Sequence, residues 1–147
     1  MFLLDTNVVS ELRKVYSGKA DPNVSLWAKS VAASDLFISA ITIEELEIGI
    51  LLIERRDPVH GAMLRAWLDG RVLTAFASRI LPVDTAVAQR SGKLHVPNPY
   101  PVRDGLIAAT ALVHGMTVVT RNVEDFIPSG AITMNPWEPP LGRRSER

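Results

Sequence analysis

Apolar residues change their spacing several times along the chain, and each change predicts a boundary between a strand and a helix. Residues 1–4 form an uninterrupted apolar run that ends at Asp5. A short run of this kind is typical of a strand buried on both faces of a parallel sheet. From Val8 to Val15 the apolar residues recur at helical spacing instead. Asp5 is therefore expected at the carboxyl edge of a sheet, where ligands bind in open α/β folds.

The same alternation continues through the rest of the chain. We predict further strands at 36–41, 80–83, 117–120 and 131–134, helices at 24–33, 42–56, 61–76, 85–94 and 102–115, and proline-containing loops at 18–23 and 95–101. Strands that alternate with helices indicate βαβ units. The predicted fold class is α/β, with a mostly parallel central sheet of four to five strands and helices on both faces. We expect one domain over 1–137 and a flexible tail, rich in Pro, Gly and Arg, over 138–147.

Composition narrows the range of possible chemistry. The chain has 147 residues and no cysteine, which excludes zinc–thiolate sites, iron–sulfur clusters, thiol catalysis and disulfides. Its 16 basic and 16 acidic residues give a net charge of zero, so there is no global basic surface for nucleic acid. The apolar runs are too short for a signal peptide or a bilayer span. We therefore expect a soluble cytoplasmic protein.

Three carboxylates are expected at one edge of the sheet. Asp5 follows the first strand, Glu44 follows the second, and Asp104 lies in the first turn of the helix that leads into the 117–120 strand. Helix capping is the competing explanation, because acids are favoured at helix starts. The segment from Thr42 to Glu45 resembles a capping box with Thr42 as the N-cap, which gives Glu45 a structural role and leaves Glu44 free.

Two more polar residues follow the fourth strand. Asn122 and Asp125 are three residues apart, so each could instead cap a short helix. Clustered carboxylates repel one another and become useful when divalent cations neutralise them. Mg²⁺ prefers such oxygen ligands, and two ions about 3.5–4 Å apart can stabilise a phosphodiester displacement. The three histidines lack ligand spacing, and there is no Walker loop or dinucleotide fingerprint.

Five segments, in this order and at this spacing, are similar to those of a known family. They are residues 3–8, Leu-Leu-Asp-Thr-Asn-Val; residues 39–49, which begin Ser-Ala-Ile-Thr-Ile-Glu-Glu-Leu; residues 103–111, Arg-Asp-Gly-Leu-Ile-Ala-Ala-Thr-Ala; residues 118–126, which begin Val-Val-Thr-Arg-Asn; and residues 135–137, Asn-Pro-Trp. The chain resembles PIN-domain ribonucleases of the VapC toxin type over nearly its whole length. The resemblance implies a three-layer PIN-like fold and a Mg²⁺- or Mn²⁺-dependent endoribonuclease. It also implies the toxin of a toxin–antitoxin pair.

The same resemblance implies the roles of individual residues. The acidic metal site would consist of Asp5, Glu44 and Asp104, with Thr6 and Thr120 supporting it through their hydroxyls. Many family members carry a fourth acid where this chain has Asn122. Either Asn122 takes part in catalysis through its amide or through water, or Asp125 substitutes for the missing acid.

Partners are implied by the family as well. A small antitoxin would cover the acidic groove and would supply any DNA binding. The toxin would form a homodimer, and no membrane partner is expected. Trp27, Trp67 and the helices over 42–76 are candidate partner surfaces, although core packing also explains both tryptophans. Arg103 and Arg121 flank the acidic edge and could contact RNA phosphates or simply face solvent.

Two other functional classes are compatible with parts of the sequence. A metal-dependent small-molecule phosphatase of the haloacid dehalogenase type would have a second Asp two residues after the first, where this chain has Asn7. A PIN-like RNA-binding module with weak catalysis is favoured by Asn122 alone. Cleavage of mixed RNA with Mg²⁺, with and without EDTA, would distinguish a nuclease from a binding module.

Overall fold

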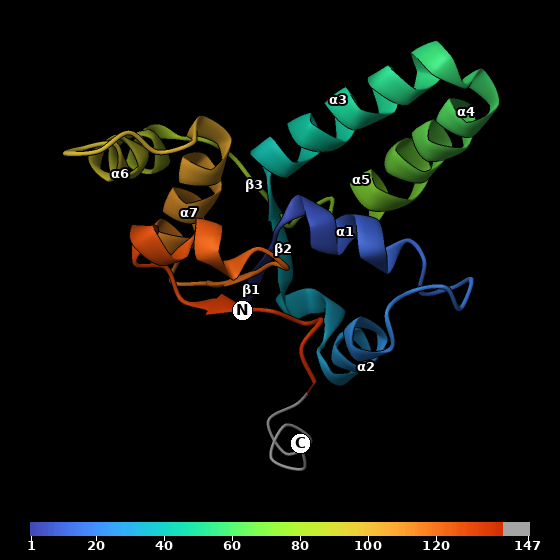
Figure 1. Ribbon diagram of the computed structural model, residues 1–147, viewed down its shortest axis with the longest axis horizontal. Helices are drawn as coiled ribbons and strands as arrows, with labels where there is room; N and C mark the ends of the chain where they lie inside the picture. Colours follow the sequence, from blue (N-terminus) through green and yellow to red (C-terminus); the bar gives the residue numbers. More distant parts are fainter. Residues whose placement is uncertain (140–147) are drawn as a thin grey trace.

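The central element of the fold is a five-stranded sheet in which every pair of neighbouring strands is parallel. A computed structural model describes residues 1–139, and its strands follow the order β3-β2-β1-β4-β5 (Figure 1). Their bounds are β1 Phe2–Leu4, β2 Leu36–Ser39, β3 Ile80–Leu81, β4 Thr117–Val119 and β5 Thr133–Met134. The predicted α/β class is confirmed. The first strand of the chain is the central strand, so segments on both sides of the sheet meet at the end of β1.

Helices connect the strands, largely where the sequence predicts them. They are α1 Thr6–Leu12, α2 Pro22–Ser30, α3 Ala40–Arg56, α4 Pro58–Trp67, a π-helical turn η2 Leu68–Val72, α5 Leu73–Ala75, α6 Thr85–Leu94 and α7 Val102–His114, with short 3-10 turns η1 Ala33–Asp35, η3 Val123–Asp125 and η4 Ile127–Ser129. Pro22, predicted to lie in the 18–23 loop, instead stands at the start of α2, and Pro58 stands at the start of α4 and separates it from α3. Proline suits that position because its φ is already helical and its missing N–H would have no partner there.

The start of α3 also differs from the prediction. The helix begins at Ala40, and its N-cap is Ser39, whose hydroxyl accepts a hydrogen bond from the Ile41 N–H at 3.0 Å. The proposed capping box with Thr42 as N-cap is therefore wrong. Thr42 lies inside the helix and is fully buried. Because β2 ends at Ser39, a good capping residue is already in place before Thr42 is reached.

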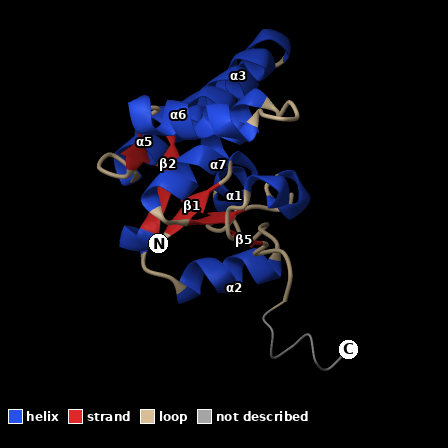
Figure 2. Cartoon of the chain, turned by 90° about the vertical axis from the view of Figure 1, so that its left-hand side faces the viewer, coloured by secondary structure: helices blue, strands red, loops and turns tan. Residues whose placement is uncertain are grey.

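Two hydrophobic clusters cover the two faces of the sheet. Leu4 packs with Val8 of α1 and with Leu46 and Ile50 of α3 on one face. The neighbouring residue Leu3 belongs to the second cluster, on the α7 side. The side chains of successive strand residues point to opposite faces, so β1 contributes to both clusters. The result is a three-layer arrangement with helices on both sides of the sheet (Figure 2).

The hairpin of α3 and α4 projects away from the sheet (Figure 1). Its two helices approach closely at Gly61, where an added Cβ would lie 2.7 Å from the Glu54 Cα. Arg65 joins the helices further along through ion pairs with Glu47 at 2.6 Å and Glu54 at 3.2 Å. Only a glycine permits this approach of α4 to the backbone of α3.

Trp27 and Trp67, the two tryptophans considered as candidate partner surfaces, both pack against the hydrophobic core. Trp27 contacts Phe2 edge to face, with ring centroids 5.6 Å apart, and Trp67 packs partly buried against the first cluster. Within residues 1–139, no helix combines the length and apolar character that a bilayer crossing requires. The predicted tail at 138–147 falls almost entirely outside the described residues.

Candidate functional site at the carboxyl edge of the sheet

Asp5 lies at the end of the central strand and is held by three hydrogen bonds. Its Oδ1 accepts the Thr6 N–H at 2.8 Å, and its Oδ2 accepts the Thr120 hydroxyl at 2.8 Å and the Asn7 amide at 3.3 Å. Only 7% of Asp5 is exposed. Capping and a place in the site, which the sequence presents as alternatives, therefore coexist in this residue. The bonds fix its carboxylate at the edge of the sheet.

The segment after β4 is connected to α1 by hydrogen bonds of Asn7 and Thr120, two residues that also bond to Asp5. Asn7 Oδ1 accepts the Arg121 N–H at 3.2 Å, and the Thr120 hydroxyl accepts the Asn122 N–H at 3.0 Å. Asn122 is exposed and precedes η3 without a side-chain capping bond. The idea that it caps a helix is therefore wrong, and its amide group is available for another role.

Glu45, rather than Glu44, contacts the residues around Asp5. The Thr6 hydroxyl donates to Glu45 Oε1 at 2.6 Å, and Arg103 Nε lies 3.2 Å from Glu45 Oε2. Glu44 is exposed and lines a cleft that opens beside Asp104. Glu45 stands three residues after the buried Thr42, so the two share one side of α3.

Asp104 faces the other carboxylates from the first turn of α7. Burial, followed by the nearby charges of Asp5, Asp125 and Glu45, raises the pKa of Asp104 from 3.8 to about 6, while Arg103 opposes the rise. The rise in this pKa reflects burial first and the neighbouring negative charges second.

The pKa of Asp5 is raised too. Burial is the main cause, hydrogen bonds from Thr120 and Thr6 oppose it, and the charges of Glu45 and Asp125 add to the rise. Asp125 therefore acts on both Asp5 and Asp104, although it does not cap a helix. Residues from four separate segments of the chain share one electrostatic environment.

A cleft of about 620 Å³ opens beside these acids, lined by Glu44, Glu45, Pro101, Val102, Arg103 and Asp104. Carboxylate oxygens are the ligands that Mg²⁺ prefers, and excess negative charge favours a cation. Among the described side chains, no three carboxylates or imidazoles are gathered closely enough to hold an ion by themselves. These residues fit an ion that keeps several waters and uses one or two carboxylates, as Mg²⁺ commonly does.

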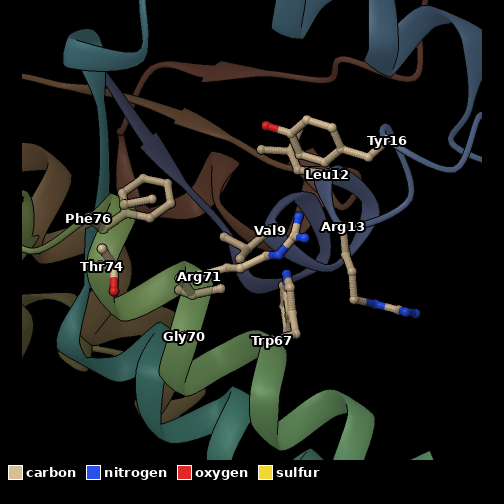
Figure 3. Close-up of a pocket in the computed structure, with 11 residues that line it drawn as sticks. Val9, Leu12, Arg13, Tyr16, Trp67, Gly70, Arg71, Thr74 and Phe76 are labelled. Carbon is tan, nitrogen blue, oxygen red and sulfur yellow. The ribbon is translucent and has the colours of Figure 1, made fainter.

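A second cavity of about 420 Å³ lies toward the opposite end of α1. Leu12 and Tyr16 line it from one side, and Trp67, Arg71 and Phe76 from the other (Figure 3). This groove is more apolar than the cleft and contains no carboxylate. Its lining suits a protein segment better than it suits metal chemistry.

Sequence reasoning missed two contributors to the site. Glu45 was assigned to capping, although its spacing from Leu46 and Ile50 places it beside the buried side of α3. Asn7 was considered only as the missing second acid of a phosphatase. Its bridge between Asp5 and Arg121 depends on the pairing of β1 with β4, which no local pattern reveals.

The chain belongs to the PIN domain family, whose model matches residues 2–126. It is 38% identical to the VapC ribonuclease Y4jK of Sinorhizobium fredii, over 95% of this chain and 99% of that protein. It is 35% identical to Toxin FitB of Neisseria gonorrhoeae, over 93% and 99% of the two chains. A chain in the crystal structure of FitAcB from Neisseria gonorrhoeae superposes with a TM-score of 0.83 at 34% identity, covering 94% of this chain and 99% of that one. The family resemblance and the PIN-like fold are confirmed.

Proposed function

We propose that this protein is a Mg²⁺- or Mn²⁺-dependent endoribonuclease of the VapC type, active in the cytoplasm as the toxin of a toxin–antitoxin pair. The observation that carries the proposal is the convergence of Asp5, Glu45, Asp104 and Asp125 at one edge of the sheet, where the charges of Glu45 and Asp125 raise the pKa of both Asp5 and Asp104. Relatives named as VapC ribonucleases support the same reaction. Membership of the PIN family favours this proposal over the phosphatase.

The roles of the acids follow from their positions. Asp5 and Asp104 would hold the cation directly, and Glu45, in place of the predicted Glu44, would be the third ligand through a coordinated water. A bound divalent ion would lower the pKa of a coordinated water and neutralise charge on the phosphate. Thr6 and Thr120 orient Glu45 and Asp5 through their hydroxyls. The edge of the sheet then presents fixed oxygen ligands to one side of the cleft.

Arg103 supplies a positive charge at the same place. Its ion pair with Glu45 puts a guanidinium beside Asp104, where a substrate phosphate would have to approach. Arg121 stacks on the Trp137 ring, with its guanidinium carbon 5.2 Å from the ring centroid. These two arginines would attract RNA locally although the chain has no net charge.

The proposed antitoxin would contact both concave surfaces. Structures similar to this one include FitAB bound to a DNA fragment and a toxin–antitoxin complex from Klebsiella pneumoniae. A C-terminal antitoxin segment would cover the acidic cleft, and an apolar segment with acidic flanks would fill the groove beside Trp67. Arg13 and Arg71 at that groove stack on Trp67 and Tyr16, and neither pairs with a carboxylate within residues 1–139. Any DNA binding would come from the antitoxin.

A homodimer is supported by exposed apolar side chains on the α3–α4 hairpin. Leu51 and Leu52 of α3 are 53% and 61% exposed, and Val59 and Met63 of α4 are 76% and 67% exposed. Val59 and Met63 are four residues apart and share one face of α4, whereas Leu51 and Leu52 are consecutive residues of α3. We expect Leu52→Glu to convert a dimer to a monomer, as measured by light scattering, without changing the thermal melt of the monomeric fold.

The adjacent glutamates provide a matched test of the active site. Glu45→Gln removes a charge hydrogen-bonded to Thr6, whereas Glu44→Gln removes an exposed charge one residue away. We expect Glu45→Gln to lose Mn²⁺-dependent cleavage of an RNA pool, and to relieve growth arrest when the toxin is produced alone. Glu44→Gln should retain most activity. Loss of activity in Glu44→Gln alone would return the third ligand to Glu44, and no EDTA-sensitive cleavage by the wild type would refute the proposed reaction.

A further inference from the structure

A further cavity, distinct from the groove beside Trp67, adjoins the acidic cleft and has a different chemical character from it. It measures about 480 Å³ and is formed by the 93–101 loop and the segment after β4. Pro101 lines both this cavity and the acidic cleft, so the two are neighbours. The walls are mainly proline rings and Val96, with the Tyr100 ring as the one aromatic surface and Lys93 as the one cation. We call this cavity the Tyr100 pocket.

The Tyr100 ring is held in a fixed position at the boundary of the two cavities. Its hydroxyl donates a hydrogen bond to the Asp125 carbonyl, and its backbone N–H donates to His95 Nδ1 at 3.3 Å. The His95 ring contacts it edge to face, with centroids 6.4 Å apart. The ring edge also packs on Gly105, where an added Cβ would lie 3.3 Å from Tyr100 Cδ1. Gly105 directly follows Asp104, so the ring stands beside the proposed metal ligand.

We propose that the Tyr100 pocket binds one unpaired base of the RNA, next to the phosphodiester bond that is cleaved. This inference rests on the proposed ribonuclease function and names how the same site holds its substrate. An RNA strand whose phosphate reaches Asp104 can place a neighbouring nucleotide in the pocket past Pro101, which lines both cavities, and the pocket is large enough for a small ligand.

The chemistry of the lining fits a base. Proteins recognise single-stranded RNA by stacking splayed bases on aromatic side chains, and a ring that is already fixed loses little freedom on binding. Lys93 can approach a phosphate of the same strand, and the Glu124 carboxylate can accept a hydrogen bond from an exocyclic amino group of the base. The carboxylates of Glu124 and Asp125 line this pocket. They would repel the acidic flanks of the partner segment that is proposed for the groove beside Trp67.

An abasic-substitution cycle would test the proposal. Cleavage sites are first mapped on an RNA pool, and oligonucleotides with one abasic position on either side of the cut are then compared with the intact sequence. For the wild type, we expect one abasic position to lower kcat/KM by roughly tenfold or more, the magnitude of one base–aromatic stack. Tyr100→Leu should lower kcat/KM for the intact oligonucleotide by the same factor and lose the abasic effect. Tyr100→Phe should keep that effect, and Ile132→Ala, at an exposed residue that lines neither the pocket nor the cleft, should behave as the wild type.

The possible outcomes separate this inference from the proposed function. If the wild type cleaves RNA but the abasic penalty is equal in the wild type and Tyr100→Leu, the base-binding role is refuted while the ribonuclease stands. If Tyr100→Leu weakens only inhibition by the antitoxin, the pocket belongs to the partner and the inference is again overturned. If the wild type cleaves no RNA, the ribonuclease proposal itself fails. Should Tyr100→Leu not fold, Val96→Glu places a charge in the pocket at a residue that is 76% exposed, and it should abolish the abasic effect.

Discussion

Replacing Asp104 by asparagine should stabilise the metal-free protein at neutral and higher pH while it abolishes Mn²⁺ binding and RNA cleavage. Folding raises the pKa of this carboxyl from 3.8 to about 6. A group whose pKa rises on folding favours the folded state while it is protonated, and that contribution is lost as the pH passes through the folded value. Above about pH 7 the ionised carboxylate therefore destabilises the fold. Asparagine has nearly the same shape and remains neutral.

The size of the effect can be worked from the same values. A pKa of about 6 against 3.8 corresponds to about 3 kcal/mol at most, since one pKa unit is worth about 1.4 kcal/mol. Asp104 is partly exposed, so solvent screens its interactions with Asp5, Asp125 and Glu45. We expect a stabilisation of about 1 to 1.5 kcal/mol after that screening.

Urea denaturation in EDTA would measure this difference. At about pH 8 the variant should unfold at a higher urea concentration than the wild type, and at about pH 3, below the unfolded pKa, the two midpoints should nearly coincide. Addition of Mn²⁺ should stabilise the wild type and leave the variant unchanged. Asp69→Asn, an acid with a side chain 55% exposed and remote from the site, is the control. A variant less stable than the wild type at pH 8, or a difference independent of pH, would refute the assigned electrostatics.

Two further predictions concern single positions. Gly61→Ala should destabilise the protein by about 1–3 kcal/mol in chemical denaturation, because the new methyl group would overlap the backbone of α3. Gly49→Ala, whose added Cβ would lie in open space, should not destabilise it. Asn122→Asp should tighten Mn²⁺ binding by about 1 kcal/mol in isothermal titration, since it adds a negative charge beside the other acids. If Asp125 already replaces the missing acid, Asp125→Ala should lower metal affinity with little change in the melt. Unchanged affinity in both variants would exclude this segment from the metal site.

The local sequence predicts the positions of helices and strands better than it predicts which side chains are in contact. The order of strands and helices follows from apolar spacing, and the position of Asp5 after β1 follows from that order. The third acid depends on the rotation of α3 about its axis, which changes with the helix start. Ser39 and Thr42 are both good N-caps, and the choice of Thr42 moved the expected contact from Glu45 to Glu44.

Residues in loops were harder to place. The surroundings of Tyr100 are the α6–α7 loop, Gly105 and the backbone of Asp125, and these come together only in the tertiary structure. Asp125 illustrates the same difficulty, because an aspartate that caps a helix and an aspartate that only contributes charge look the same in the sequence. The absence of a side-chain capping bond at η3 removes the first role and leaves the second.

The central position of β1 has a consequence for how the protein is made. β1 is synthesised long before β4, with which it pairs on one side, and Thr120, which directly follows β4, holds the Asp5 carboxylate. A nascent chain that ends before this point has Asp5 without its hydroxyl partner and β1 without one of its two neighbours. Synthesis must therefore pass β4 before the acidic site can assemble. For a nuclease that acts on RNA, this order of assembly would delay activity until the segment after β4 has been made.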